Sequence, residues 1–236
     1  MQLFYSESIS QESDIYTFPR EESKHIIRVL RKKMDDLVTI TNGKGFLFEG
    51  KVIDENPNKC TIQIQSSTYQ EPIPYKLHIA IAPTKLNDRF EWFLEKATEI
   101  GITEITPIIC NHSERKQIKE ERYKKILQSA MKQSLQTHLP VLNTAVSFKD
   151  FISSQVKAAF SAIAHCEEGE KIPLTKDLII ANDILILIGP EGDFSTNEIQ
   201  QSIELGYTPI TLGNSRLRTE TAGIVASHSI AFLSQQ

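Results

Sequence analysis

Two glycine-bearing segments in the second half of the chain could hold a small molecule. The first is "ILILIGPEGDFSTNEI", residues 184–199, in which an apolar run ends at Gly189 and a proline and Gly192 follow. Glycines let the backbone approach a ligand closely, and proline stiffens a loop. The segment contains neither G-K-[ST] nor G-x-G-x-x-G, and Glu191 and Asp193 would repel a phosphate. The pattern favours a binding site for a neutral or cationic molecule. The alternative is that the segment is only a turn leading into a helix, whose start is capped by the S-x-x-E of Ser195 and Glu198.

The second segment, "ITLGNSRLRTETAGIVA" at residues 210–226, repeats the order of strand, glycine, irregular stretch and helix start. If its strand neighbours the first, the two loops form one pocket at the carboxyl edge of a parallel sheet. Arg216 and Arg218 would then lie at the rim and meet an anionic partner. The helix that follows is small and apolar nearly all round, which indicates burial in the core or against a second subunit.

The elements that must position these loops follow from the hydrophobic pattern. From residue 77 onward strands and helices alternate, and runs such as "ILILI" that are apolar throughout predict a parallel sheet between helices. Residues 35–68 predict a small antiparallel module, preceded by one short helix in "REESKHIIRVLRKK". The prolines of "EPIPYK" predict a linker, so we place the domain boundary between residues 1–72 and 73–236.

Composition excludes several classes of protein. The three cysteines are far apart, the six histidines have no metal spacing, and no serine lies in G-x-S-x-G, so we expect neither a metal nor acyl-enzyme chemistry. No leader pattern and no apolar run of about 20 residues is visible, which predicts a cytoplasmic protein with no membrane partner. The net charge of −4 gives no overall attraction for nucleic acid. Phosphates would have to be bound by local basic patches.

The segments "IGPEGDFS" and "LGNSRLRTETA", together with "HIIRVLRKKMDD" and "KLNDRFEWFLEKATEIGITEITPI", resemble the signature segments of the RsmE-type methyltransferases. These SPOUT-class enzymes methylate N3 of a uridine in 16S ribosomal RNA of the small subunit. The resemblance covers the whole chain. It implies an α/β fold class: a SPOUT-type trefoil-knotted C-terminal domain, residues 73–236, with a small N-terminal PUA-like β-barrel, residues 1–72. It also implies S-adenosylmethionine as cofactor, a homodimer, and ribosomal RNA within the assembled small subunit as the partner.

The resemblance further implies roles at the matching positions. We expect the cofactor to be bound by Ile188, Gly189, Pro190, Glu191, Gly192, Leu212, Gly213, Ser215, Leu217, Arg218, Thr219 and Ala222. We expect RNA to be bound by His25, Arg28, Arg31, Lys32 and Arg216. Arg218 with Lys85 or Arg89 would face the anionic uridine, and Glu220 is a candidate base. For Glu220, a structural role as an acid in the first turn of a helix is the favoured interpretation.

Some residues retain alternative interpretations. Asp193 replaces the family's usual glycine, Ser215-Arg216 alters a common R-I-L-R, and Gln136 replaces a frequent arginine. The N-terminal basic residues could instead be the solvated face of a helix, while Trp92 and Phe93 are predicted to pack in the core.

Two other functions stay open: methylation of another nucleotide or of a ribose hydroxyl, and RNA binding without catalysis.

Overall fold

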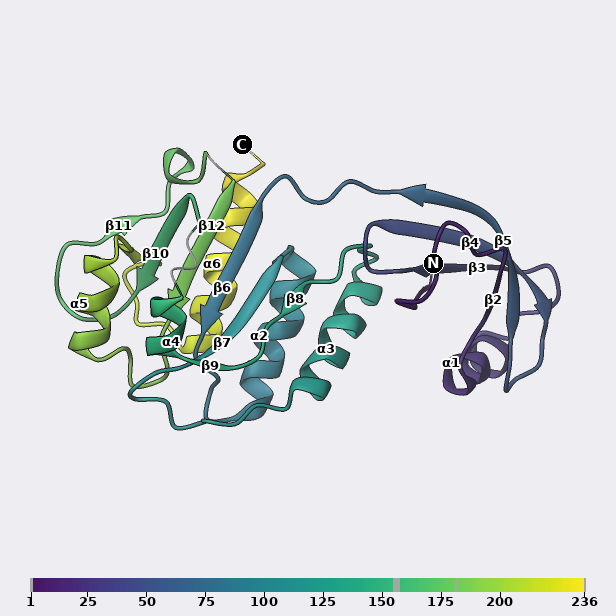
Figure 1. Cartoon of the computed structure of the whole chain (residues 1–236), viewed down its shortest axis with the longest axis horizontal. Coiled ribbons are helices and arrows are strands. Elements are labelled where there is room, and N and C mark those ends of the chain that lie inside the picture. The colour runs from purple at the N-terminus through teal and green to yellow at the C-terminus, as the bar shows by residue number, and fades with distance from the viewer. Residues whose placement is uncertain (1, 155–157, 181, 236) are drawn as a thin grey trace. The chain divides into compact units, whose positions relative to one another are not determined.

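The computed structural model describes residues 2–154, 158–180 and 182–235 (Figure 1). The chain divides into two compact units. The first comprises Met1–Pro72 with Met131–Leu139, and the second comprises Ile73–Ala130 with Pro140–Gln236. No helix among the described residues is long and apolar enough to cross a membrane.

The first unit is built on a strongly curled five-stranded sheet in the order β1-β3-β4-β5-β2. Its strands are β1 Leu3–Tyr5, β2 Ile15–Thr17, β3 Leu37–Thr41, β4 Phe46–Asp54 and β5 Thr61–Tyr69. Only the β1–β3 pair is parallel. The fully buried side chains of Phe18, Ile26 and Phe48 lie in its core. The antiparallel module is therefore confirmed, although the short strands β1 and β2 were not predicted.

The predicted N-terminal helix differs in form from the expectation. It consists of α1 Arg20–Lys24, which continues as a π-helical turn, η1 His25–Val29. Arg31 then takes a left-handed conformation with φ 55°, which an α-helix cannot contain. The helix therefore ends before the basic run does.

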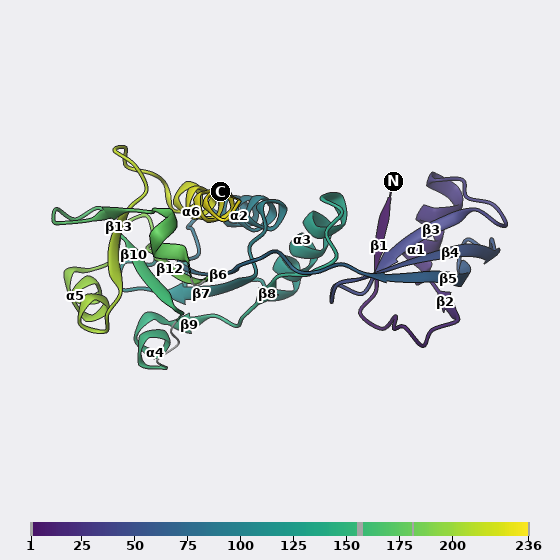
Figure 2. The same cartoon turned by 90° about the horizontal axis from the view of Figure 1, so that it is seen from above.

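The second unit contains a parallel sheet in the order β11-β13-β10-β12-β6-β7-β8, with β9 also pairing with β7. Its strands are β6 Lys76–Ile81, β7 Glu104–Ile109, β8 Val141–Leu142, β9 Val146–Ser147, β10 Phe160–Ala164, β11 Ile172–Pro173, β12 Asp183–Ile188 and β13 Thr208–Thr211. Its helices are α2 Asn87–Ile100, α4 Phe148–Ser153, η2 Lys176–Ile179, α5 Thr196–Glu204 and α6 Thr219–Leu233. Helix α3, Glu120–Gln133, begins in this unit, and its last residues, Met131–Gln133, are assigned to the first unit. Helices α2 and α6 pack together on one face of the sheet, and α4 lies on the other (Figure 2).

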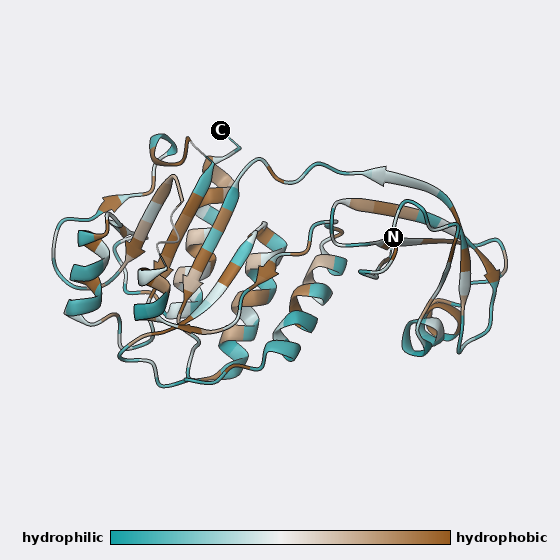
Figure 3. Ribbon diagram, in the orientation of Figure 1, coloured by the Kyte–Doolittle hydropathy of each residue, from teal (hydrophilic) through white to brown (hydrophobic). Residues whose placement is uncertain are grey.

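The apolar strand of the first glycine segment is β12, which is apolar along most of its length (Figure 3) and buried from Ile184 to Ile188. Burial on both faces confirms the predicted parallel sheet between helices. Helix α2 ends at Gly101, whose φ of 114° lies in the left-handed region that favours a glycine at the end of a helix.

The prediction for Trp92 was wrong. Phe93 is fully buried beside Phe90 and Leu94, but Trp92 is 46% exposed. Neighbouring residues on a helix point about 100° apart, so one of the two had to leave the face that packs on the sheet.

Candidate functional site

The two glycine loops lie at the same edge of the sheet, where the strands β12 and β13 end. These strands are not neighbours, because β10 pairs with both of them. Ala164 at the end of β10 pairs with Ile188 of β12 on one side and Ile210 of β13 on the other. The chain after β10, residues 165–171, therefore becomes a third loop of the site. No role for this third loop was predicted from the sequence.

Two adjoining cavities lie among these loops. The larger has a volume of about 370 Å³ and is lined by Ala164, His165, Cys166, Lys171, Ile210, Thr211, Leu212, Gly213, Asn214, Ser215, Arg216, Leu217 and Ala222. The smaller measures about 260 Å³ and is lined by Ala164, Cys166, Ile188, Gly189, Pro190, Glu191, Asp193, Arg216, Leu217, Arg218, Thr219 and Ala222. Because several residues line both, the cavities share a wall formed by Ala164, Cys166, Arg216, Leu217 and Ala222.

All of the residues expected to bind the cofactor line one cavity or both, except Gly192. A Cβ atom on Gly192 would lie 3.1 Å from the Cβ of His112, outside either lining. The His112 ring is itself close to this loop, since its Nδ1 lies 3.1 Å from the carbonyl oxygens of both Gly192 and Asp193. Gly192 thus leaves room for His112, whereas Gly189 is the glycine of this loop that borders the smaller cavity.

The two acids of the first glycine loop tie it to the loops on either side. Glu191 Oε1 accepts a 2.8 Å hydrogen bond from the backbone N–H of Lys85, which follows β6. Asp193 Oδ2 accepts a 2.7 Å hydrogen bond from the backbone N–H of Cys166, which follows β10. Since β6 and β10 are the two sheet neighbours of β12, the carboxylates connect three consecutive strand ends. The side chain of Arg115 extends these connections by donating to the carbonyls of Thr84 and Lys85.

The same loop is also anchored to the helices that follow the two glycine segments. The Ser195 and Glu198 side chains form the predicted capping box at the start of α5. The buried Thr219 hydroxyl, at the start of α6, donates a 3.0 Å hydrogen bond to the carbonyl of Gly189. The backbone that lines the smaller cavity is therefore held at both ends by hydrogen bonds within the chain.

Of the four catalytic candidates, only Arg218 lines a cavity. Lys85 forms an ion pair of 2.7 Å with Glu114, and this hydrogen bond raises the pKa of Lys85. Arg89 Nε lies 3.7 Å from Oε1 of Glu220, a carboxylate that is only 4% exposed. The second oxygen, Oε2, is buried without a partner among the described residues. This burial between α6 and α2 supports a structural role for Glu220 over a role as base.

His165 is the most notable lining residue that the sequence analysis missed. Both of its ring nitrogens are buried and have no partner in the described part of the chain. Burial lowers the pKa of His165, and the nearby charge of Lys171 lowers it further. A neutral imidazole offers one donor and one acceptor. The only sequence signal was its place just after an apolar strand of a parallel sheet.

The residues expected to bind RNA fall in both units. His25 and Arg28 lie in η1, and Arg31 and Lys32 follow it. Arg28 and Arg31 are exposed, whereas the His25 ring packs edge-on against Phe4 with 6.1 Å between centroids. Arg216 belongs to the second unit and lines both cavities.

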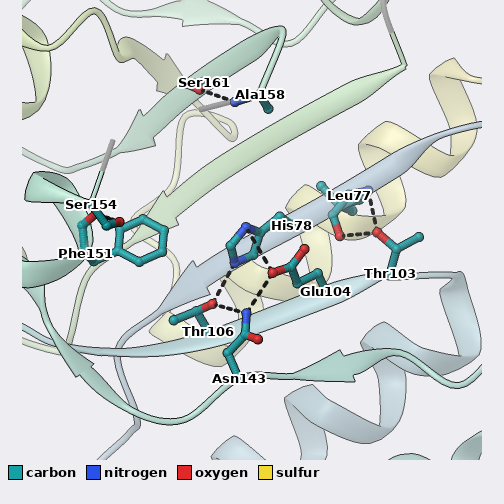
Figure 4. A network of polar contacts seen from close by, with 10 residues as sticks. All are labelled: Leu77, His78, Thr103, Glu104, Thr106, Asn143, Phe151, Ser154, Ala158 and Ser161. Atoms are coloured by element: carbon teal, nitrogen blue, oxygen red, sulfur yellow. Dashed lines mark hydrogen bonds and ion pairs between the residues drawn. The ribbon is translucent and has the colours of Figure 1, made fainter. Parts of the chain in front are cut away.

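A separate polar network lies near the amino ends of β6 and β7 (Figure 4). His78 Nε2 forms a 2.7 Å hydrogen bond with the Thr106 hydroxyl, and Asn143 donates to both Thr106 and Glu104. Burial lowers the pKa of His78, against the opposing effect of the Glu104 and Asp183 carboxylates. The network fixes two strands far from the glycine loops. Within residues 2–154, 158–180 and 182–235 no group of three or more His, Cys, Asp or Glu is placed to hold a metal ion.

Comparison with known proteins gives a consistent result across the whole chain. Residues 71–231 match the family model of the RNA methyltransferase domain, and residues 18–65 match that of the RNA methyltransferase PUA domain. A probable rRNA methyltransferase from Porphyromonas gingivalis has 38% identity and a TM-score of 0.88, with 100% of this chain and 99% of that chain covered. A protein from Legionella pneumophila, solved with the cofactor SAM bound, has 26% identity and a TM-score of 0.82, and the match covers 97% of this chain and 96% of that chain.

Among curated proteins, the chain is 25% identical to the ribosomal RNA small subunit methyltransferase E of Rickettsia conorii, over 98% of this chain and 95% of that protein. These comparisons confirm the predicted fold class, a mixed α/β domain of the SPOUT type with an N-terminal PUA domain.

Proposed function

The chain belongs to the RNA methyltransferase family, and from this premise we propose that it methylates N3 of a uridine in 16S ribosomal RNA of the small subunit. It is an S-adenosylmethionine-dependent enzyme, as its family relationships show. The observation that carries the proposed site is the pair of adjoining cavities at one sheet edge, which both glycine loops line. We further propose that the enzyme works in the cytoplasm on the assembled small subunit.

The residues of the cavities fit S-adenosylmethionine. Its adenine needs donors and acceptors, and His165 presents two buried ring nitrogens that lack a partner among the described residues. The Gly189 carbonyl is anchored by the Thr219 hydroxyl, and a Cβ atom on Gly189 would lie 3.0 Å from Phe194 N, so the loop backbone beside the smaller cavity has no room for a side chain. When bound, the cofactor supplies a methyl group on a positively charged sulfur.

The task of the protein is to position the uridine and to favour loss of its N3 proton. N3 is a poor nucleophile until that proton leaves, so positioning and deprotonation together limit the reaction. We assign Arg218 to the negative charge that develops on the uridine, because its side chain borders the smaller cavity. Glu220 holds Arg89 in place, and Arg89 and Lys85 attract the neighbouring phosphates.

The direct test is to delete the gene and map methylated nucleotides in ribosomal RNA by mass spectrometry. We expect one N3-methyluridine of 16S RNA to disappear and to return when purified protein and S-adenosylmethionine are added to small subunits. A methyl group found on another base or on a ribose hydroxyl would contradict the proposed specificity. A protein that binds RNA but shows no heat of binding with S-adenosylmethionine would support the non-catalytic alternative.

We predict that the protein is a homodimer. Helix α6 carries an exposed pair, His228 stacked on Phe232 at 6.1 Å, and Phe232 is 53% exposed. A second copy would cover this apolar surface. Light scattering at micromolar concentration should give twice the chain mass, and Phe232→Asp should shift the protein toward monomer. A wild-type monomer would contradict the prediction.

We also predict that the exposed arginines of the first unit contact RNA phosphates. Arg28→Ala with Arg31→Ala should weaken RNA binding, lower the log–log salt slope by about 2, and leave S-adenosylmethionine affinity unchanged. The control is Lys51→Ala with Lys59→Ala, which removes two other exposed charges of this unit. Wild-type affinity and salt slope in the arginine variant, or equal losses in both variants, would refute a local patch.

A further inference from the structure

Asp193 occupies a backbone conformation that a glycine would adopt more easily. Its φ is 62°, in the left-handed region that few residues with a side chain enter. The local turn does not require an aspartate, because it is closed by a 2.9 Å hydrogen bond from the Asp193 backbone N–H to the Pro190 carbonyl. The function of an acid at this position therefore has to lie in its side chain.

The Asp193 carboxylate uses its two oxygens for different purposes. Oδ1 accepts a 2.8 Å hydrogen bond from the adjacent Phe194 N–H, which is a local contact. Oδ2 accepts the N–H of Cys166, at 2.7 Å, from the loop after β10. A carboxylate that accepts from an N–H at this distance makes one of the stronger hydrogen bonds in proteins.

The loop after β10 depends on side-chain contacts for its position. Lys171 Nζ donates to the carbonyls of His165 at 3.2 Å and Glu167 at 2.6 Å, which closes the loop on itself. Two contacts then join it to the loop after β12: the Asp193–Cys166 bond and a 2.8 Å hydrogen bond from Thr196 to Glu167. The Thr196 contact needs two side chains to be ordered, whereas the Asp193 bond orders one side chain on a backbone N–H, so its entropic cost is smaller.

We propose that Asp193 is a positioning residue that fixes the wall shared by the two cavities and thereby prepares the site for S-adenosylmethionine. Cys166, whose backbone it holds, lines both cavities, and His165 is the preceding residue. Without the carboxylate, both residues lose a fixed position and the cofactor has to order them on binding. This inference rests on the proposed function of the cavities.

The test compares three substitutions of Asp193 by calorimetry with S-adenosylmethionine and by thermal unfolding without it. Asp193→Gly removes the carboxylate and accepts the positive φ, so we expect the dissociation constant to rise about tenfold, or about 1.4 kcal/mol, with no loss in Tm. Asp193→Ala should bind as weakly but unfold at a lower temperature. Asp193→Asn tolerates the conformation and retains one acceptor oxygen, so it should restore part of the affinity.

The matched control is Asp35→Gly, because Asp35 has φ 65° but lies in the first unit. It should leave cofactor affinity unchanged. In steady-state assays Asp193→Gly should raise KM for S-adenosylmethionine while kcat at saturation is retained, and hydrogen exchange at the Cys166 amide should become faster. A purely structural role would instead lower Tm in every variant.

Wild-type cofactor affinity and unchanged Cys166 exchange in Asp193→Gly would overturn the proposed positioning role. A wild-type protein that binds no S-adenosylmethionine would overturn the proposed function, together with the cofactor part of this inference. The two failures are therefore distinguishable in the same set of measurements.

Discussion

Gly189→Val is expected to abolish S-adenosylmethionine binding while leaving a folded protein. Gly189 borders the smaller cavity, and a Cβ atom there would lie 3.0 Å from both the backbone nitrogen and the ring of Phe194. A backbone atom cannot yield as a flexible side chain can, so the loop must move and give up the Thr219 hydrogen bond that anchors it. A displaced loop would change the shape of the smaller cavity, which Gly189 and its neighbours line.

Calorimetry should show no heat of binding for Gly189→Val at cofactor concentrations that saturate the wild type, and Gly189→Ala should show a smaller loss. The control is Gly50→Ala in β4 of the first unit, where the new Cβ would lie 2.7 Å from the Ile62 side chain. That variant should lower Tm through overpacking but keep its affinity. Full cofactor affinity in Gly189→Val would refute the assignment of the smaller cavity.

Arg218→Ala is expected to lower the rate of methyl transfer by about 10²–10³, as removal of a preorganised group that stabilises transition-state charge commonly does. Arg218 precedes α6 and lines the smaller cavity, and its exposed side chain leaves the fold independent of it. Because the proposed role concerns charge that develops during the reaction, kcat should fall far more than RNA affinity.

The matched control is Arg216→Ala, two residues earlier in the same loop, where Arg216 lines both cavities. We expect that variant to weaken RNA binding and to retain more of kcat. Arg218→Lys keeps the charge but not the planar donor geometry, so it should recover part of the rate. If Arg218→Ala lost RNA binding altogether with kcat unchanged, its role would be recognition.

The sequence by itself determined the elements around the site and the location of the glycine loops. The apolar run of β12, the capping box of Ser195 and Glu198, and the stop of α2 at Gly101 all depend on residues within a few positions of one another. Local side-chain chemistry and hydrophobic pattern decide such features, so they can be predicted from the sequence. The family resemblance further identified which glycine segments line the cavities.

Only the tertiary structure decided how the loops are joined. The strand order places β10 between β12 and β13, and this brings His165 and Cys166 into the site. The same strand order lets Asp193 and Glu191 hydrogen-bond to residues that are 27 and 106 positions away in the chain. From the sequence, these two acids had instead indicated a binding site for a cationic ligand. Hydrogen bonds between residues so far apart depend on which strands become neighbours in the sheet. No local pattern of apolar and polar residues specifies that order, because it results from the packing of the whole domain.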